Sequence, residues 1–486
     1  MKLEKLLKGL DKCQIFGDKQ VEITSLAFDT TQVTKGSIFF CLKGSNLDGH
    51  IFVDIAIAKG AVAVVCSQDI YSSVTTIKVK DTRKALSIVS SNFFGNPSEK
   101  LKIIGVVGTN GKSTTAYIIQ RLLLTGGYKC GLVGTMYCEW GNHRESSSLT
   151  TPDPIVLHRL FRDMVEDGME YVVMEISAHA IYLDKMYGVK PEICVFTNLS
   201  QDHLDYFGTL AKYKQVKKSY FNACNIKMAV VNVDDECGME ILSECDVPCI
   251  TYGLENPADS FAIDYMTTSK DCKYVLNLMD SILLISTRLY GKFNVYNALA
   301  SCVVAKVIGV SDQDIVESLH TIIPPAGRFN VFHTKGINYV IDFAHTPDGL
   351  YNLIKEGRNM TTSRVIVVFG CGGDRDVSKR PIMGKIASEM ADIVIVTSDN
   401  PRTESRKTIA TDIISGMTGK GKLYVELDRP KAIALAKEIA VEGDVVLIAG
   451  KGSEEYIDEN NDKMPYSDVA QLSKVTNCKW TIAQKY

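Results

Sequence analysis

The feature that most constrains the fold is a short segment, residues 101–115, in which an apolar run passes through a glycine turn into a helical pattern. The turn reads Gly108-Thr-Asn-Gly-Lys-Ser113. Backbone N–H groups of such a turn and of the following helix N-terminus bind anions, Lys112 adds positive charge, and the serine hydroxyl can coordinate Mg²⁺. The general nucleotide-binding pattern has a further glycine where this chain has Val106. The turn can also be an ordinary strand-to-helix connection, but its place after an apolar strand favours a phosphate site within an α/β fold.

Length and composition limit the possible classes of protein. A chain of 486 residues is too long for one hydrophobic core, so two to four domains are expected. The net charge of -3 and the absence of a basic block argue against nucleic acid as a partner. The sequence has no signal-peptide pattern and no apolar run of the roughly 20 residues that span a membrane. The 14 cysteines form no Cys-x-x-Cys pair, so we expect free thiols in a cytoplasmic protein.

Two breaker-rich segments, Gly95–Ser98 and Pro324–Arg328, divide the chain into three predicted domains, 1–98, 99–328 and 329–486. Apolar runs alternate with helical patterns in each domain, which predicts a three-domain α/β protein. The central domain should be a parallel sheet that carries the phosphate loop, with an N-terminal α/β domain and a C-terminal Rossmann-like α/β domain on either side. Alternating runs between about residues 260 and 290 predict an antiparallel extension of the central sheet.

Polar side chains follow the predicted strands, where ligands of parallel sheets bind. In the central domain, Glu175 and Ser113 offer oxygen ligands that suit Mg²⁺, whereas a lone histidine such as His203 is more often structural. In the third domain, three loops at strand ends are rich in Arg, Asp, Asn and Glu. They can be solvated loops or can together form a pocket for a zwitterion, in which Arg would pair with a carboxylate.

Five segments, taken together and in this order, resemble the Mur ligase family. They span most of the region from Asp29 to Glu454. The segments are Gly108-Thr-Asn-Gly-Lys-Ser-Thr114, Met174-Glu-Ile-Ser177, Asn198-Leu-Ser-Gln-Asp-His-Leu-Asp-Tyr206, Asp342-Phe-Ala-His-Thr-Pro-Asp348 and Asp399-Asn-Pro-Arg402.

The resemblance implies an ATP-dependent ligase of cytoplasmic peptidoglycan precursor synthesis that acts as a monomer. Its substrates would be ATP, meso-diaminopimelate and UDP-MurNAc-L-Ala-D-Glu, with Mg²⁺ as cofactor. The γ-phosphate would pass to the D-glutamyl side-chain carboxylate, and the incoming amine would attack the resulting acyl phosphate to form an amide. The first domain would hold the UDP-sugar, the second ATP and the third the amino acid.

The resemblance also implies roles for individual residues. The catalytic set would be Lys112, Glu175, His203, Lys217, Arg328 and His345. ATP would contact Gly108, Thr109, Asn110, Gly111, Lys112, Ser113, Thr114, Asn294, Arg328 and Asp342. The UDP-linked substrate would contact Thr30, Thr150, Thr151, Ser177 and Lys185. The metal ligands would be Ser113, Glu175, His203 and a carbamylated Lys217, although Lys217 on sequence alone reads as a solvated lysine.

The amino-acid pocket implied by the resemblance contains Arg375, Asp399, Asn400, Arg402, Gly450 and Glu454. Diaminopimelate differs from lysine by one distal carboxylate, and Arg402 suits that charge. Lysine-adding relatives lack this arginine. A buried arginine without a partner would penalise lysine, so part of the selectivity would come from rejection.

Four positions depart from the family pattern and leave other activities open. Thr31 replaces an arginine on the uridine side, Lys185 replaces another arginine, Ala178 replaces a serine, and Ser453 replaces a histidine beside Glu454. One alternative is a lysine-adding or folylpolyglutamate-type ligase. The folded first domain and the Thr150–Asp153 segment argue against the folate activity. A third possibility is a nucleotide-binding relative that has lost ligation.

Overall fold

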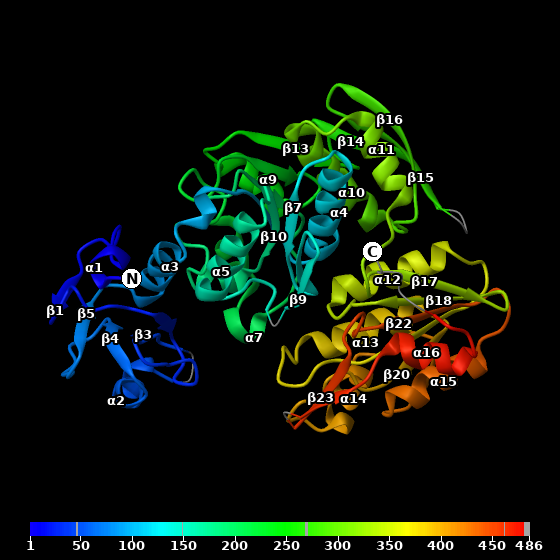
Figure 1. The fold of residues 1–486 in the computed structure, drawn as a ribbon. Coiled ribbons are helices and arrows are strands. Elements are labelled where there is room, and N and C mark those ends of the chain that lie inside the picture. The colour runs from blue at the N-terminus through cyan, green and yellow to red at the C-terminus, as the bar shows by residue number, and fades with distance from the viewer. Residues whose placement is uncertain (45–46, 148, 268–270, 461, 481–486) are drawn as a thin grey trace.

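The chain folds into three α/β units, each built on its own sheet (Figure 1). This computed structural model describes residues 1–44, 47–147, 149–267, 271–460 and 462–480. In Figure 1 the N-terminal unit is blue, the central unit is cyan to green, and the C-terminal unit is yellow to red. The predicted three-domain α/β class is confirmed. The domain boundaries at 98/99 and 328/329 stay predictions.

The N-terminal unit is a five-stranded sheet in the order β1-β5-β4-β3-β2, in which only β1 is antiparallel to its neighbour. The apolar residues of β3 and β4 are buried in the interior of this sheet. The elements are α1 (Leu3–Leu6), β1 (Gln14–Phe16), β2 (Ser25–Ala27), β3 (Ser37–Phe40), α2 (Val53–Ala58), β4 (Ala61–Cys66), β5 (Thr75–Lys78) and α3 (Thr82–Phe93).

The central unit is an eleven-stranded sheet with β6 (Lys102–Val107) near its middle, between β10 (Tyr171–Ile176) and β11 (Ile193–Phe196). Strands β14 to β7 are parallel in the order β14-β13-β12-β11-β6-β10-β7. The predicted antiparallel extension is confirmed at one edge, where β15 and β16 continue from β14. A second antiparallel extension, β7-β8-β9, was not predicted, because β9 (His143–Ser146) is polar and exposed and gives no apolar run.

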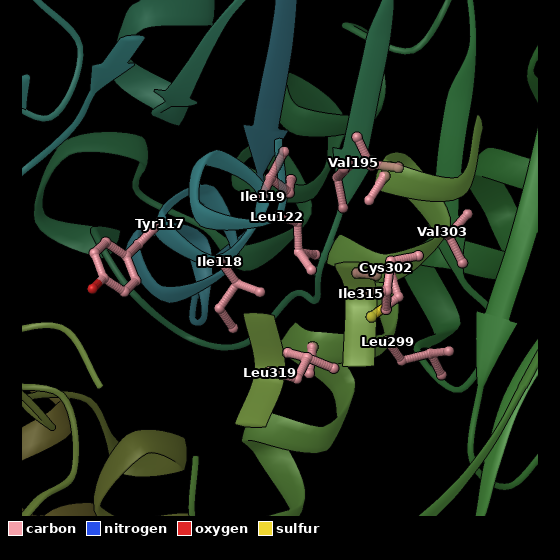
Figure 2. Close-up of a cluster of buried hydrophobic side chains, with 14 of the residues drawn as sticks. Tyr117, Ile118, Ile119, Leu122, Val195, Leu299, Cys302, Val303, Ile315 and Leu319 are labelled. Atoms are coloured by element: carbon pink, nitrogen blue, oxygen red, sulfur yellow. The ribbon is translucent and has the colours of Figure 1, made fainter. Parts of the chain in front are cut away.

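Helices cover both faces of the central sheet. Alternate residues of β6 face opposite sides: Ile104 and Val106 pack with α4 and α10, and Ile103 and Val107 pack with α5 and α9. Figure 2 shows the first of these cores, where side chains from α4, β11, α10 and α11 meet. The remaining elements are α4 (Lys112–Thr125), β7 (Cys130–Val133), β8 (Tyr137–Trp140), α5 (Pro154–Glu166), α6 (Ala178–Tyr182), α7 (Leu204–Phe207), α8 (Leu210–Lys218), β12 (Ala229–Asn232), α9 (Glu236–Glu244), β13 (Cys249–Gly253), β14 (Ser260–Thr267), β15 (Cys272–Leu278), β16 (Ser281–Thr287), α10 (Lys292–Ile308) and α11 (Asp312–Thr321).

The C-terminal unit is a six-stranded sheet in the order β17-β18-β22-β19-β20-β21, parallel except for β17 at its edge. A separate hairpin, β23-β24, follows the last strand of this sheet. The elements are β17 (Asn330–Thr334), β18 (Ile337–Asp342), α12 (Pro347–Asn359), β19 (Val365–Phe369), α13 (Lys379–Met390), β20 (Ile393–Val396), α14 (Arg406–Ser415), β21 (Lys422–Val425), α15 (Arg429–Ile439), β22 (Val445–Ala449), β23 (Tyr456–Glu459), β24 (Asp462–Pro465) and α16 (Asp468–Thr476).

Two expectations from composition can be compared with this fold. All 14 cysteines are free thiols, as their spacing predicted. In the part of the chain that the structure describes, no helix combines the length and apolar character needed to cross a membrane.

Candidate functional site

The phosphate loop connects the end of β6 to the start of α4, and its two glycines are required by contact. A Cβ on Gly108 would lie 1.8 Å from Thr197 Oγ1. Gly111 has a φ of +82°, and a Cβ there would lie 2.4 Å from Asn297 Oδ1. The first turn of α4 follows immediately, and its backbone N–H groups have no partner within the helix. The loop therefore has the close-packed backbone and the free helix N–H groups that a phosphate site requires.

Lys112 lies over this loop. Its Nζ donates to the carbonyl oxygens of Gly108 and Thr109, at 2.9 and 2.8 Å. Burial lowers the pKa of Lys112, whereas the nearby carboxylates of Glu175 and Asp202 raise it. An anion at the loop would therefore strengthen the charged form of this lysine.

Glu175, at the end of the neighbouring strand β10, joins three segments through one carboxylate. Ser113 Oγ donates to its Oε2 at 2.9 Å, and the backbone N–H of Thr135 donates to its Oε1 at 2.7 Å. Arg328, from the segment that leads into the third unit, donates from Nη2 to Ser113 Oγ at 3.0 Å. A carboxylate, a hydroxyl and a guanidinium therefore meet at the start of α4.

His203 directly precedes α7, as its N-cap residue, in the left-handed conformation with a φ of +54°. Its Nε2 lies 3.4 Å from Asp202 Oδ2, and His345 Nε2, from the third unit, lies 4.0 Å from the same oxygen. Burial lowers the pKa of His203 to about 4 and also lowers the pKa of His345. Asp202 thus connects two histidines from different units, a role that the sequence analysis did not assign.

Lys217, on α8, is not the solvated lysine that the sequence alone favoured. Its side chain is only 1% exposed. Its Nζ lies 4.5 Å from the centre of the Tyr213 ring and 3.4 Å from Thr109 Oγ1 in the phosphate loop. Burial lowers the pKa of this amine well below its usual value, and nearby Lys112 lowers it further.

A cavity of about 500 Å³ opens beside the loop, between the central and C-terminal units. It is lined by Asn110, Gly111 and Thr114 of the predicted ATP-binding set, by Asn294, Arg328 and Asp342 of the same set, and by His345. Gly108, Thr109, Lys112 and Ser113 lie on the adjoining loop and helix N-terminus.

A hydrogen bond ties the loop to the third unit at this cavity. Asn110 Nδ2 donates to Asp348 Oδ2, near the start of α12, at 2.8 Å. Burial raises the pKa of Asp348, and the hydrogen bond from Asn110 opposes that rise. The sequence analysis quoted Asp348 in a motif but gave it no role.

Four of the five residues predicted for the UDP-linked substrate lie together beside Glu175. Thr151 Oγ1 donates to the Glu175 carbonyl at 2.9 Å and accepts from the backbone N–H of Ser177 at 3.0 Å. Thr150 Oγ1 accepts from Thr135 Oγ1 at 3.1 Å. Lys185 Nζ forms an ion pair with Asp153 at 2.8 Å and donates to the Thr151 carbonyl at 3.4 Å.

The fifth, Thr30, lies in the loop after β2 of the N-terminal unit, where its carbonyl accepts from Lys59. The structure shows the contacts of two further residues that depart from the family pattern, Thr31 and Ala178. Thr31 donates from both its N–H and its hydroxyl to Asp29 Oδ1, so it closes a local turn. Ala178 is buried in a small core with Phe207 and Tyr213.

The residues predicted for the amino acid lie beyond the carboxyl ends of three neighbouring strands: Arg375 follows β19, Asp399, Asn400 and Arg402 follow β20, and Gly450 and Glu454 follow β22. Asn400 Nδ2 donates to Glu454 Oε2 at 2.9 Å. A Cβ on Gly450 would lie 2.4 Å from Asp399 Oδ2, so glycine is needed there. Arg402 donates from Nη1 to the Gly373 carbonyl at 2.6 Å.

The two arginines of this pocket differ in their surroundings. Arg402 has a φ of +50°, and its Nε lies 3.8 Å from Asp458 Oδ2. Arg375 donates to the Asp374 carbonyl at 3.0 Å, on an exposed loop. The pocket also contains Lys451, which the sequence analysis did not select. A lysine in a glycine-rich loop reads as solvated, and only the folded chain buries it.

The comparisons with known proteins match this geometry. The Mur ligase middle domain model matches residues 106–305, the Mur ligase glutamate ligase domain model matches 327–452, and the Mur ligase family catalytic domain model matches 22–94. The chain belongs to the Mur ligase family. The UDP-N-acetylmuramoyl-L-alanyl-D-glutamate–2,6-diaminopimelate ligase 1 of Clostridium acetobutylicum is 41% identical over 94% of this chain and 95% of its own.

The chain is also similar to other Mur ligases in sequence and in fold. The corresponding diaminopimelate ligase of Geobacillus kaustophilus is 39% identical over 97% of this chain and 98% of its own. A solved structure of a UDP-N-acetylmuramoyl-L-alanyl-D-glutamate–2,6-diaminopimelate ligase superposes with a TM-score of 0.70 and 29% identity, over 98% of this chain and 99% of its own. The MurF ligase of Thermotoga maritima, solved in complex with ADP, shares the fold with a TM-score of 0.63 and 22% identity, over 88% of this chain and 94% of its own.

Proposed function

We propose that this Mur ligase adds meso-2,6-diaminopimelate to the D-glutamyl side-chain carboxylate of UDP-MurNAc-L-Ala-D-Glu, with ATP hydrolysed to ADP and phosphate. The observation that carries the choice of amino acid is Arg402, which follows Asn400 by two residues beyond the carboxyl end of β20 and whose Nε lies 3.8 Å from Asp458 Oδ2. The relatives with about 40% identity, named as diaminopimelate ligases, support the same choice. Because its substrates are nucleotide-linked, we place the reaction in the cytoplasm, and we expect a monomer.

The proposed reaction has two steps. A carboxylate oxygen of the D-glutamyl residue attacks the γ-phosphorus of ATP, and the bond to ADP breaks to leave an acyl phosphate. The neutral amine of diaminopimelate then attacks the acyl carbon and loses a proton, and the tetrahedral intermediate expels phosphate to leave an amide. Phosphorylation is needed because a carboxylate has no leaving group better than oxide.

Residues from four parts of the chain would position ATP for the first step. Lys112 over the loop and Arg328 beside Ser113 supply positive charge where negative charge develops on the transferred group. His345 and Asn294, which line the adjoining cavity, would contact the nucleotide. Positioning and charge neutralisation are the main contributions of the protein in such transfers.

The residues present fit Mg²⁺. The hydroxyl of Ser113 and the carboxylate of Glu175 are hard oxygen donors 2.9 Å apart, and His203 is the further proposed ligand. Among the residues that the structure describes, no three His, Cys, Asp or Glu side chains form a ready-made metal cluster. Mg²⁺ commonly takes only one or two protein carboxylates, with water and phosphate oxygens completing its shell. When bound, the ion would neutralise charge on the phosphates.

Lys217 would contribute as a carbamate. Burial favours the neutral form of this amine, and the neutral nitrogen is the form that bonds to the carbon of CO₂ with loss of a proton. The product is a carboxylate-like group close to the phosphate loop, since the unmodified Nζ lies 3.4 Å from Thr109 Oγ1. Such a group would supply a further oxygen ligand for a second Mg²⁺.

The experiment is an ADP-release assay with purified protein, ATP, Mg²⁺, UDP-MurNAc-L-Ala-D-Glu and one amino acid at a time. We expect release that requires both the UDP-linked dipeptide and meso-diaminopimelate. Strong turnover with lysine and none with diaminopimelate would contradict the proposed specificity. Turnover of a folate in place of the UDP-sugar would assign another ligase activity, and binding of ATP without any amide product would indicate a protein that has lost ligation.

A further inference from the structure

Lys451 lies in the loop after β22 with no exposed surface. Its Nζ donates to Asn400 Oδ1 at 2.8 Å and to Glu454 Oε2 at 3.0 Å, and it lies 3.9 Å from Asp399 Oδ1. A buried ammonium is stable only when nearby carboxylates and acceptors compensate for its lost hydration. Lys451 is therefore a cation held inside the pocket that we assign to the amino acid.

The contacts of Lys451 determine which way the Asn400 amide points. Asn400 Oδ1 accepts two hydrogen bonds, from Lys451 Nζ and from the backbone N–H of Asp458 at 2.9 Å. On the other side of the amide, Nδ2 donates to Glu454 Oε2. The ammonium of Lys451 and the N–H of Asp458 are donors, so they require the amide oxygen of Asn400 on their side. The carboxylate of Glu454 is an acceptor, so it requires the amide nitrogen. Only the observed orientation of the Asn400 amide satisfies all three groups.

We propose that Lys451 is a positioning residue that sets the specificity of this pocket for diaminopimelate. This inference rests on the proposed function. By holding Asn400 Oδ1, Lys451 keeps the donor side of the amide available to the carboxylate of the substrate, and by holding Glu454 Oε2 it fixes the carboxylate that would meet an ammonium group. Both acceptors of Lys451, Asn400 and Glu454, belong to the predicted amino-acid site. Lys451 should therefore affect binding of the amino acid and not binding of ATP or the UDP-linked dipeptide.

Without Lys451 the same pocket would select less well. Asn400 Oδ1 would keep only the N–H of Asp458, so the amide would be held less firmly with its donor side toward the substrate. Glu454 would lose its cationic partner and could move toward Arg402, the group proposed to bind the distal carboxylate. The movement of Glu454 would weaken binding of diaminopimelate more than binding of lysine, which has no distal carboxylate.

The test compares Lys451→Met with Lys463→Met. Lys463 is a matched control because it is exposed on β24 and contacts the same aromatic ring, Tyr456, at 4.3 Å from the ring centre, against 5.7 Å for Lys451. For Lys451→Met we expect the KM for meso-diaminopimelate to rise about tenfold or more, the size of effect from losing a charged hydrogen bond. The KM values for ATP and for the UDP-linked dipeptide should change less than about twofold, and the preference for diaminopimelate over lysine should fall. Lys463→Met should match the wild type in all four quantities.

Thermal melting checks the fold, and Lys451→Gln is the second variant. Glutamine removes the charge but can still donate to Asn400, so its KM for diaminopimelate should lie between those of the wild type and of Lys451→Met. An unchanged KM in a folded variant, an equal rise in all three KM values, or loss of folding in both variants would assign Lys451 a structural role and overturn the inference. A wild-type protein that releases no ADP with diaminopimelate would instead refute the proposed function.

Discussion

The hydrogen bond from Asn110 to Asp348 connects the phosphate loop to the third unit, and its removal gives a quantitative test of how the cavity is built. A hydrogen bond to a charged acceptor contributes about 1.5–3 kcal/mol. Because both side chains are only partly buried, we expect the lower end of this range, a coupling energy of about 1.5 kcal/mol. That corresponds to about a tenfold change in kcat/KM for ATP.

The assay is a double-mutant cycle on ADP release with wild type, Asn110→Ala, Asp348→Ala and the double variant. We expect the double variant to lose less activity than the product of the two single losses, because the shared contact can be lost only once. Asn352 provides the control, since it donates to the other oxygen of Asp348, at 3.1 Å, and lies on the same helix. Asn110 and Asn352 both donate to Asp348 and not to each other, so Asn110→Ala and Asn352→Ala should show a smaller coupling than Asn110→Ala and Asp348→Ala. Additivity of Asn110 with Asp348 within about 0.3–0.5 kcal/mol would refute the contact as a functional link.

Three further predictions follow from single residues. Gly111→Ala should raise the KM for ATP strongly, because the added Cβ would clash with Asn297 and the φ of +82° would strain the backbone of an alanine. The control is Gly127→Ala, which has a φ of +83° but no atom near the added Cβ. It introduces the backbone strain alone and should leave the KM for ATP unchanged. Lys217→Met should abolish ADP release, and a labile mass increase of one CO₂ in bicarbonate should appear in the wild type only; full activity of the variant would contradict a ligand role. Burial lowers the pKa of His158 from 6.5 to about 4, so the folded state binds this proton less tightly than the unfolded state does. The free energy of unfolding is therefore highest above pH 6.5 and falls as the pH drops toward 4, by about 2 kcal/mol between pH 7 and 5. Urea midpoints at pH 7 and 5 should differ less in His158→Leu than in the wild type, and equal differences would refute the assignment.

The elements whose role is local could be predicted from the sequence. The phosphate loop is recognisable because strand, glycines, lysine and serine are adjacent in the chain, and the geometry at Gly108 and Gly111 explains why those glycines are needed. The buried strands could be predicted because each is one continuous apolar run in the sequence. The hairpin strand β9 was missed, because its four residues are exposed and polar and give no apolar run.

The contacts between distant segments could not be predicted from the residues themselves. Asn110 and Asp348 are 238 positions apart, and neither residue alone indicates the other. Lys217 and Lys451 carry no local signal of burial, since lysine is normally exposed and each lies in an ordinary polar segment. Only the family resemblance pointed to Lys217, and nothing in the sequence analysis pointed to Lys451.

The measurement that tests the central claim most directly is product mass in a competition reaction. The protein is incubated with ATP, Mg²⁺, UDP-MurNAc-L-Ala-D-Glu and equal concentrations of meso-diaminopimelate and L-lysine, and the UDP-linked products are analysed by mass spectrometry. The account predicts one main product, the UDP-linked dipeptide extended by a diaminopimelyl residue, formed only with ATP. A product extended mainly by lysine, or no extended product while ATP is present, would contradict it.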